Sequence, residues 1–418
     1  MGRSIGFLMS LLTLVALPTA RSGAQNSLEA TMITSGPKHH IFGYIGHVRT
    51  TPWNASGRYI VALEFDRQDR MPGPDDAATI VLIDTRNKFA MHAVDETRAW
   101  NPQQGTMLYW NPKAPETQFF FNDRDRKTGK VFCVLFDVSA GTNGRRVREY
   151  RVEDTPVGNS GVAQNGGWFC AINYARLARL RPVTGYPGTW DWTVEEKHPE
   201  NDGVFKINTE TGEKKLLVSF KQLADALRAS RPDVDQRALF INHTLWNREG
   251  DRIFFFARGD FSDTANRINA AFVMHPDGTG LTPLKQHIGG HPEWDTGHRM
   301  IGAIGKDQVI FDVDSQEVVG KIGSPEILSD PEGDIALSPD AQWFVNGSSK
   351  GVQTYYVFLR RQDGHYLRSR GFFRDRWLSG DLRIDPSPCW NRDGSAILFP
   401  SVASDAQKTR QIFLLRRE

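Results

Sequence analysis

One short pattern of apolar and polar positions recurs along the chain. Each copy starts with an aromatic or apolar residue, passes through a polar turn that usually contains Gly, and ends in three or four apolar residues that favour β-strands. The seven copies begin at Trp53, Trp110, Ala163, Trp246, Trp294, Leu337 and Trp390. Asn or Asp followed by Gly supplies the positive φ of a tight hairpin, so each apolar run is expected to be a strand buried on both faces.

The spacing of the copies predicts the fold. Successive copies lie 43 to 83 residues apart, with further apolar runs and turns between them. Such spacing is typical of propeller blades with four strands each. We therefore expect an all-β, seven-bladed β-propeller with four-stranded blades, which forms a single domain over residues 25–418.

The longest interval, between the third and fourth copies, interrupts this rhythm. A stretch over Ser219–Ser230 has apolar residues at helical spacing, Phe220, Leu223 and Leu227. We expect a partly helical insertion at about residues 171–240 on a rim of the propeller. Rim insertions build binding surfaces or simply fill space.

The N-terminus has the pattern of a targeting segment. Arg3 precedes an apolar stretch from Ile5 to Leu17, and small residues lead up to Ala24. This pattern predicts a secretory signal peptide over residues 1–24; an uncleaved anchor is the alternative. No later apolar run is long enough to span a bilayer. The mature protein is therefore expected to be exported, either periplasmic or extracellular, with no transmembrane segment.

Composition narrows the possible partners. The chain has 51 Lys and Arg against 49 Asp and Glu, and loss of Arg3 and Arg21 with the signal peptide leaves no net charge. A neutral protein has no global field to attract nucleic acid, so we expect no nucleic-acid partner. The 3 cysteines cannot form a disulfide framework. The oligomeric state stays open.

The aligned repeats contain a candidate metal site. His243, His291 and Asp334 each lie three positions before the first residue of the fourth, fifth and sixth copies. Equivalent positions in adjacent blades converge near the central channel. Two imidazoles and one carboxylate suit a divalent metal, and we predict Mn or Zn. The alternative is a hydrated ring of polar side chains.

A second cluster precedes the first repeat. Its candidate catalytic residues are Lys38, His40 and Tyr44, with Tyr44 or a His as general acid. Arg49 is a candidate substrate-binding residue, since a guanidinium can bind a carboxylate. The alternative is an N-terminal strand that closes the ring.

Two further segments supply candidates. The amides of Gln103 and Gln104 could bind sugar hydroxyls or cap a strand end. In the basic loop of the insertion, Arg179 could bind the carboxylate of an acidic sugar and Arg176 could act as a base. The alternative is that both arginines belong to a charged surface segment that only contacts water.

The segments 39–64, 100–110 and 173–181 and the repeated Trp-Asn-x-x-Gly turns resemble a group of exported bacterial propellers, the oligogalacturonate-lyase-like branch of the Tol-Pal propeller superfamily. The resemblance implies a divalent manganese in the channel, held by His and Gln ligands, and a basic residue that removes the proton next to a uronate carboxylate. It places His243 and His291 among the ligands.

The leading hypothesis is therefore an exported, carbohydrate-active propeller, a metal-assisted β-eliminating lyase that acts on oligosaccharides containing uronic acid. A cation would make the reacting proton more acidic by neutralising the uronate carboxylate. Asp334 and Ser387 stand where the resemblance implies a His-rich segment. The competing hypothesis is a non-catalytic cell-envelope propeller that binds a glycan or a protein.

Overall fold

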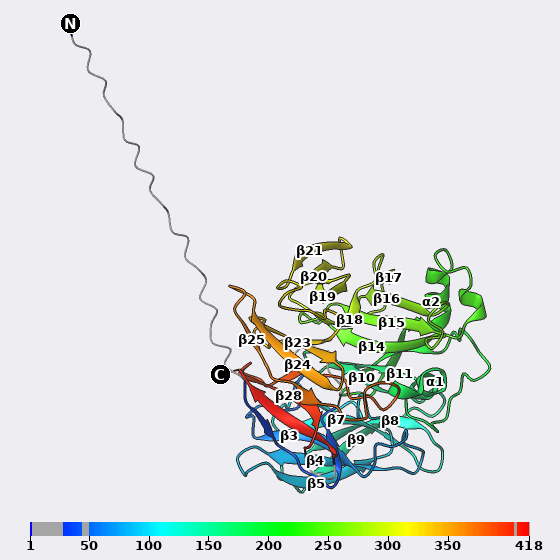
Figure 1. Ribbon diagram of the computed structural model, residues 1–418. Helices are drawn as coiled ribbons and strands as arrows, with labels where there is room; N and C mark the ends of the chain where they lie inside the picture. Colours follow the sequence, from blue (N-terminus) through cyan, green and yellow to red (C-terminus); the bar gives the residue numbers. More distant parts are fainter. Residues whose placement is uncertain (2–27, 44–49, 405–407, 418) are drawn as a thin grey trace.

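The computed structural model describes residues 1, 28–43, 50–404 and 408–417. Apart from Met1, the expected signal peptide lies outside the described residues, and so do Tyr44 and Arg49. Figure 1 shows the sheets following one another around the molecule in sequence order, so that the C-terminal strands return to the N-terminal ones.

Five separate four-stranded sheets make up most of this ring. The first contains β2 (His39–Ile41), β3 (Tyr59–Phe65), β4 (Ala78–Asp84) and β5 (Ala90–Thr97). The second contains β6 (Tyr109–Trp110), β7 (Gln118–Arg124), β8 (Val131–Asp137) and β9 (Arg145–Tyr150). The third contains β10 (Gly158–Val162), β11 (Trp168–Ile172), β12 (Gly203–Asn208) and β13 (Lys214–Ser219). The fourth contains β14 (Phe240–Trp246), β15 (Ile253–Gly259), β16 (Ile268–Met274) and β17 (Thr282–Pro283). The fifth contains β1 (Ala30–Met32), β29 (Arg410–Arg416), β28 (Ala396–Val402) and β27 (Cys389–Trp390).

The prediction of seven four-stranded blades is wrong, because the remaining strands form one nine-stranded sheet. One part of it contains β18 (Gly289–Trp294), β19 (Arg299–Ile304), β20 (Asp307–Asp312) and β21 (Glu317–Lys321). The other contains β22 (Asp334–Leu337), β23 (Trp343–Lys350), β24 (Gln353–Arg360), β25 (Tyr366–Arg368) and β26 (Phe372–Phe373). The two parts join where β18 pairs in parallel with β22, at His291 and Asp334. The repeats indicated the hairpins, but not this contact between them.

The ring is closed by the two ends of the described chain. Strand β1 pairs antiparallel with β29, which places Ala30 opposite Leu415 and Met32 opposite Phe413. The N-terminal segment thus completes the sheet that the C-terminal hairpin begins.

The core lies between neighbouring sheets, and β7 shows how the sequence builds it. Phe119, Phe120 and Phe121 are all fully buried. Because successive side chains of a strand point to opposite faces, Phe120 packs toward the third sheet while Phe119 and Phe121 pack toward the first. This confirms that the apolar runs are strands buried on both faces.

The tryptophans that begin the repeats connect neighbouring sheets. Trp246 Nε1 donates to the Gly161 carbonyl oxygen at 3.1 Å, and Trp294 Nε1 donates to the Leu245 carbonyl oxygen at 2.8 Å. Trp110 and Trp390 donate in the same way, to the Pro52 and Ala336 carbonyl oxygens. Each indole therefore fills the space between two sheets and also satisfies a backbone acceptor there.

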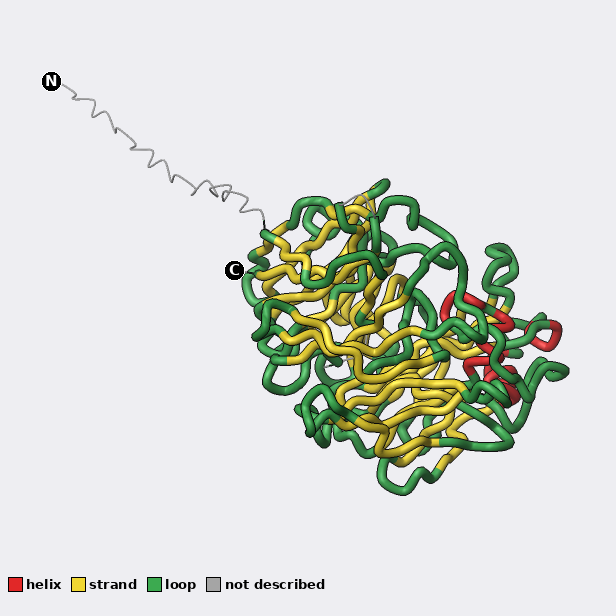
Figure 2. Tube along the Cα trace, turned by 90° about the horizontal axis from the view of Figure 1, so that it is seen from below, coloured by secondary structure: helices red, strands yellow, loops and turns green. Residues whose placement is uncertain are grey.

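The helices gather at one side of the molecule (Figure 2). Helix α1 (Tyr174–Leu180) follows β11, and α2 (Phe220–Leu227) occupies the stretch where helical spacing was found. Ser219 caps α2 through a capping box with Gln222. Within the described residues, no helix is long and apolar enough to cross a membrane.

Candidate functional site

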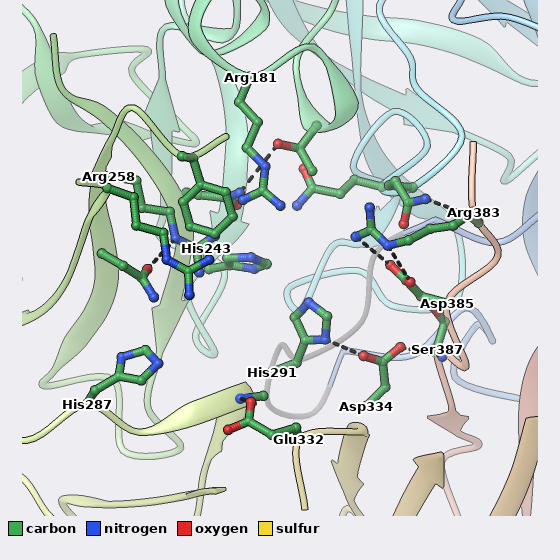
Figure 3. Close-up of a pocket in the computed structure, with 18 residues that line it drawn as sticks. Arg181, His243, Arg258, His287, His291, Glu332, Asp334, Arg383, Asp385 and Ser387 are labelled. Carbon is green, nitrogen blue, oxygen red and sulfur yellow. Dashed lines mark hydrogen bonds and ion pairs between the residues drawn. The ribbon is translucent and has the colours of Figure 1, made fainter. Parts of the chain in front are cut away.

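A cavity of about 280 Å³ opens where the first strands of several sheets begin. It takes histidines from β14 and β18, Asp334 from the start of β22, and side chains from the loops before β18 and β27. Its ionisable lining residues are Arg181, Arg258, Arg267, Arg383, His243, His287, His291, Glu332, Asp334 and Asp385 (Figure 3).

Two of the predicted metal ligands lie at irregular points of their strands. The register of β14 shifts between Asn242 and Leu245, and His243 has a φ of 60°. The register of β18 shifts across the segment that contains His291. β-Bulges change the direction of a side chain next to a site, and a non-glycine residue with positive φ carries strain. The chain thus departs from regular strand geometry where both histidines line the cavity.

His291 and Asp334 form a hydrogen-bonded pair through Nδ1 and Oδ1 (Figure 3). Burial disfavours the charged imidazole, but attraction by the Asp334 carboxylate outweighs it and raises the pKa of His291. Burial also works against the Asp334 carboxylate, yet His291 lowers its pKa overall. Asp334 Oδ2 accepts a second bond, from the Ser387 backbone N–H at 2.8 Å. Both oxygens of Asp334 are therefore engaged within the protein.

Three guanidinium groups surround one aromatic ring. The central guanidinium carbons of Arg181, Arg258 and Arg267 lie 4.1, 4.7 and 5.3 Å from the ring centroid of Phe261. Cation–π contact holds each of them on the ring. We call Arg181, Arg258 and Arg267 the arginine cluster.

The arginine cluster is partly buried and rigidly supported. Arg258 is 7% exposed, and its Nε donates to Asn269 Oδ1 at 2.8 Å. Burial, with Arg383 nearby, lowers the pKa of Arg181 to about 10. Within the described part of the chain, the buried Nη1 of Arg181 has no hydrogen-bond partner. Unpaired buried donors are costly, so this atom indicates a place for a ligand acceptor.

The loop that carries Phe261 and Arg267 connects β15 to β16 and is braced from outside. Arg231 donates to the backbone oxygens of Asn266 and Arg267 at 2.9 and 3.0 Å. The ring of Phe261 is thus held in place before any ligand arrives.

Carboxylates lie on the other side of the cavity from Arg258 in the view of Figure 3. Arg383 binds Asp385 through two bonds of 2.8 and 3.1 Å. Burial and the neighbouring Asp334 raise the pKa of Asp385. On this side of the cavity, Asp385 and Asp334 are thus paired with Arg383 and His291.

The predicted metal set does not form a metal centre. Asp334 is committed to His291 and to the Ser387 backbone N–H, so its carboxylate oxygens are both engaged. Among the described residues, no group of three or more His, Cys, Asp or Glu side chains is placed to hold a metal ion. The three residues that the repeats predicted therefore do not by themselves form a metal centre.

Gln103 and Gln104 line the same cavity as the histidines. Gln103 Nε2 donates to the Arg383 backbone oxygen at 2.6 Å. The structure therefore brings together the predicted amides and the predicted metal ligands, which are far apart in the sequence.

Arg176 and Arg179 lie elsewhere, on α1. Arg176 is fully buried, and its Nε donates to the Leu239 backbone oxygen at 2.6 Å while Nη1 donates to Thr193 and Glu196. Arg179 pairs with Asp191 at 2.9 Å. Neither side chain lines the cavity.

Lys38 and His40 also lie outside the cavity. His40 is buried between Gln411 Oε1, at 2.8 Å, and Glu64 Oε2, at 3.2 Å. Lys38 Nζ binds Glu64 Oε1 at 2.8 Å. This network joins β2 and β3 to β29 where the ring closes.

Sequence reasoning missed the arginine cluster, His287 and Asp385. One signal was available: Arg258 ends the otherwise apolar run 253–257, where a buried arginine needs a partner or a ligand. Arg176 lies within α1, whereas Arg181 is the first residue after it. The sequence distinguishes these two arginines only if the end of the helix is known.

Comparison with solved structures supports the fold. An oligogalacturonate lyase in complex with manganese matches with 16% identity and a TM-score of 0.59, over 93% of this chain and 93% of that chain. TolB from Acinetobacter baumannii matches with 12% identity and a TM-score of 0.40, over 87% of this chain and 81% of that one. The β-propeller domain of the Trilobed protease from Pyrococcus furiosus matches with 12% identity and a TM-score of 0.47, over 90% and 97%.

No protein-family profile matches the sequence, and no curated protein does so significantly. The likeness to oligogalacturonate lyase establishes an all-β propeller fold; the manganese is a property of that other protein. The protein is thus a β-propeller with a cavity lined by arginines, histidines and carboxylates.

Proposed function

We propose that this protein is exported and that its cavity binds an oligosaccharide containing uronic acid and cleaves it by β-elimination. The arginine cluster carries the proposal, because three guanidinium groups at one ring form a site for an anionic group. The guanidinium groups would offset the negative charge of a uronate carboxylate bound there, which makes the proton on the adjacent carbon more acidic.

Two histidines that line the cavity supply the proton transfers. In the reaction, a base removes the proton next to the carboxylate, those electrons form a carbon–carbon double bond, and the bond to the leaving glycosidic oxygen breaks. Burial lowers the pKa of His287, which keeps its imidazole neutral and suits it to be the base. His291, held by Asp334, can protonate the leaving oxygen.

Among the described residues, no group of three or more His, Cys, Asp or Glu side chains is placed to hold a metal ion, so no step is assigned to a metal. We expect elimination to continue after treatment with a chelator. Loss of activity in chelator and its recovery with Mn²⁺ would contradict this mechanism and support the metal-assisted one.

The proposal is tested by incubating the purified protein with oligogalacturonates and other uronic oligosaccharides and following near-ultraviolet absorbance of the unsaturated product. We expect product from the wild type and a loss of roughly 100-fold or more in His291→Gln. Arg299→Gln, which removes an exposed arginine outside the cavity, is the matched control and should keep full activity. Tight saccharide binding without product would instead support a non-catalytic glycan-binding propeller.

A further inference from the structure

A second cavity, of about 180 Å³, lies where the first strands of several sheets end. Trp110 is the last residue of β6, Val162 is the last residue of β10, and Arg392 lies just after β27. The cavity described above opens where such strands begin, so the two cavities lie at opposite ends of these strands. We call the second cavity the turn pocket. Among the described residues, it is lined by Thr50, Thr51, Tyr109, Trp110, Pro112, Pro115, Val162, Gln164 and Arg392.

Part of the wall of the turn pocket is apolar and held in place. The indole of Trp110 is fixed by its bond to the Pro52 carbonyl oxygen. Pro112 and Pro115 belong to the turn after β6, and the Pro115 carbonyl oxygen accepts the Ala55 backbone N–H at 2.8 Å. A preformed apolar wall of this kind suits the apolar part of a small ligand.

Arg392 is the one Lys, Arg, His, Asp or Glu that lines the turn pocket within the described residues. Its Nε donates to the carbonyl oxygens of Trp53 and Asn54 at 3.0 and 2.8 Å. Its Nη1 and Nη2 make no hydrogen bond or ion pair within the described part of the chain. The guanidinium is therefore held through Nε, and its remaining N–H donors are available to a ligand.

The fourth repeat contains an equivalent arginine with a different set of bonds. Arg248 and Arg392 both follow a Trp-Asn pair at the start of their turns. The Nη1 and Nη2 groups of Arg248 donate to the carbonyl oxygens of Pro339 and Ser338 at 3.1 and 3.3 Å. The same turn thus directs the Nη donors to the backbone in the fourth repeat, but not in the seventh.

The carboxylates near Arg392 do not occupy these donors. Burial lowers the pKa of Arg392, and attraction by Glu116 opposes this only in part, so a charged guanidinium lies in a partly desolvated place. Glu116 is exposed, and it accepts the backbone N–H and the hydroxyl of Ser56 at 2.7 and 2.8 Å. Asp393 accepts the Ser395 backbone N–H at 2.9 Å. The site therefore favours a ligand that brings its own anionic group.

We propose that the turn pocket is a second binding site, for a small organic acid. Its carboxylate binds the Nη groups of Arg392, and its apolar part packs against Trp110, Pro112 and Pro115. The two oxygens of a carboxylate match the paired N–H donors of a guanidinium. The volume of about 180 Å³ limits the ligand to a small molecule, such as one with a single ring. This inference does not depend on the proposed function of the first cavity.

Calorimetric titration with three probes tests the inference. Benzoate and benzamide have the same shape and differ in charge, while acetate has the carboxylate without the ring. We expect benzoate to bind at least about tenfold more tightly than either of the others, since hydrogen bonds to a charged group are worth that factor or more. Equal binding of benzoate and benzamide, or no binding of benzoate, would overturn the inference.

Variants then locate the bound benzoate. Arg392→Gln removes the guanidinium, so the affinity ratio between benzoate and benzamide should fall toward one. Arg299→Gln, outside both cavities, should leave the ratio unchanged.

A second pair of variants decides the question if Arg392→Gln does not fold, since Arg392 also binds the backbone. Pro112 is exposed, so substitutions there should keep the fold. Pro112→Glu should weaken benzoate binding about threefold or more, because the new carboxylate repels the ligand or competes for Arg392. Pro112→Gln is the neutral control and should lose much less. If benzoate binds Pro112→Glu and Pro112→Gln equally well, it binds elsewhere and the inference is overturned.

Discussion

Two arginines of one basic run show how the surroundings of a residue decide its role. Arg176 and Arg181 are five positions apart. The guanidinium of Arg176 is enclosed by backbone oxygens and stacks on Phe220, whereas that of Arg181 lines the cavity. The sequence indicated a base at Arg176 and anion binding at Arg179, and it did not single out Arg181. The end of α1 at Leu180 separated the two roles, and a helix end is difficult to place from sequence within two residues.

The structure predicts a structural role for Arg176. The Arg176 guanidinium donates to the backbone oxygens of Leu239, Glu196 and Lys197. A lysine ammonium cannot make all of these bonds, so Arg176→Lys should lower the free energy of unfolding by about 3 kcal/mol. Urea unfolding measures this change. Arg179→Lys on the same helix should cost less than about 1 kcal/mol, because its ion pair with Asp191 is partly exposed. Normal stability in Arg176→Lys with loss of turnover would restore Arg176 as a catalytic residue.

At the scale of elements, the tryptophans that begin the repeats link strands of neighbouring sheets through hydrogen bonds from the indole N–H to a backbone carbonyl oxygen. The sequence pattern located the tryptophans, because an aromatic residue before a Gly turn recurs at regular intervals. It did not show that the indole N–H groups of four of them donate to backbone carbonyl oxygens in the preceding part of the ring. Nor did it show that β14 and β18 shift register beside His243 and His291. Both features depend on a partner strand far away in the sequence.

Trp294 tests the contribution of these connections. Trp294→Phe keeps most of the ring but leaves the buried Leu245 carbonyl oxygen without its donor, so the free energy of unfolding should fall by about 2 kcal/mol. Thermal and urea unfolding measure the loss. Trp190→Phe is the control, since Trp190 is 41% exposed, and it should change stability by less than about 0.5 kcal/mol. Equal effects of the two substitutions would rule out a specific role for the indole bond.

At the scale of the whole molecule, closure of the ring depends on buried histidines. His39 Nδ1 accepts the Arg410 backbone N–H at 3.0 Å, and His40 Nδ1 lies 2.8 Å from Gln411 Oε1. Burial first, and then the Arg410 guanidinium, lowers the pKa of His39 to about 4. Burial also lowers the pKa of His40. The sequence made His40 a candidate catalytic residue; in the structure both histidines join β2 to β29.

This arrangement predicts lower stability in acid. An unfolded chain binds a proton at His39 near the usual histidine pKa of about 6.5, while the folded protein resists it down to about 4. The unfolded state is therefore favoured as pH falls through that window, by up to about 3 kcal/mol from this residue. Urea unfolding at about pH 7.5 and about pH 4.5 measures the difference.

His39→Asn keeps an acceptor near Nδ1 without a proton to gain, so the stability difference between the two pH values should shrink. The same substitution at His365, which is exposed, should leave the difference unchanged. If His39→Asn shows the same stability difference between the two pH values as the wild type, then protonation of another group causes the loss of stability in acid.

The sequence by itself determined the strand-rich character, the repeating hairpins and the helix over 220–227, because turn residues and the alternation of apolar side chains are local signals. It also selected His243, His291, Asp334, Gln103 and Gln104, which share one cavity. Only the tertiary structure decided that β18 and β22 join into a nine-stranded sheet, that Asp334 is bound to His291, and that three arginines meet at Phe261. The contacts of His291 with Asp334 and of Arg181 with Phe261 join residues tens of positions apart, and their geometry depends on how the sheets pack rather than on any local pattern.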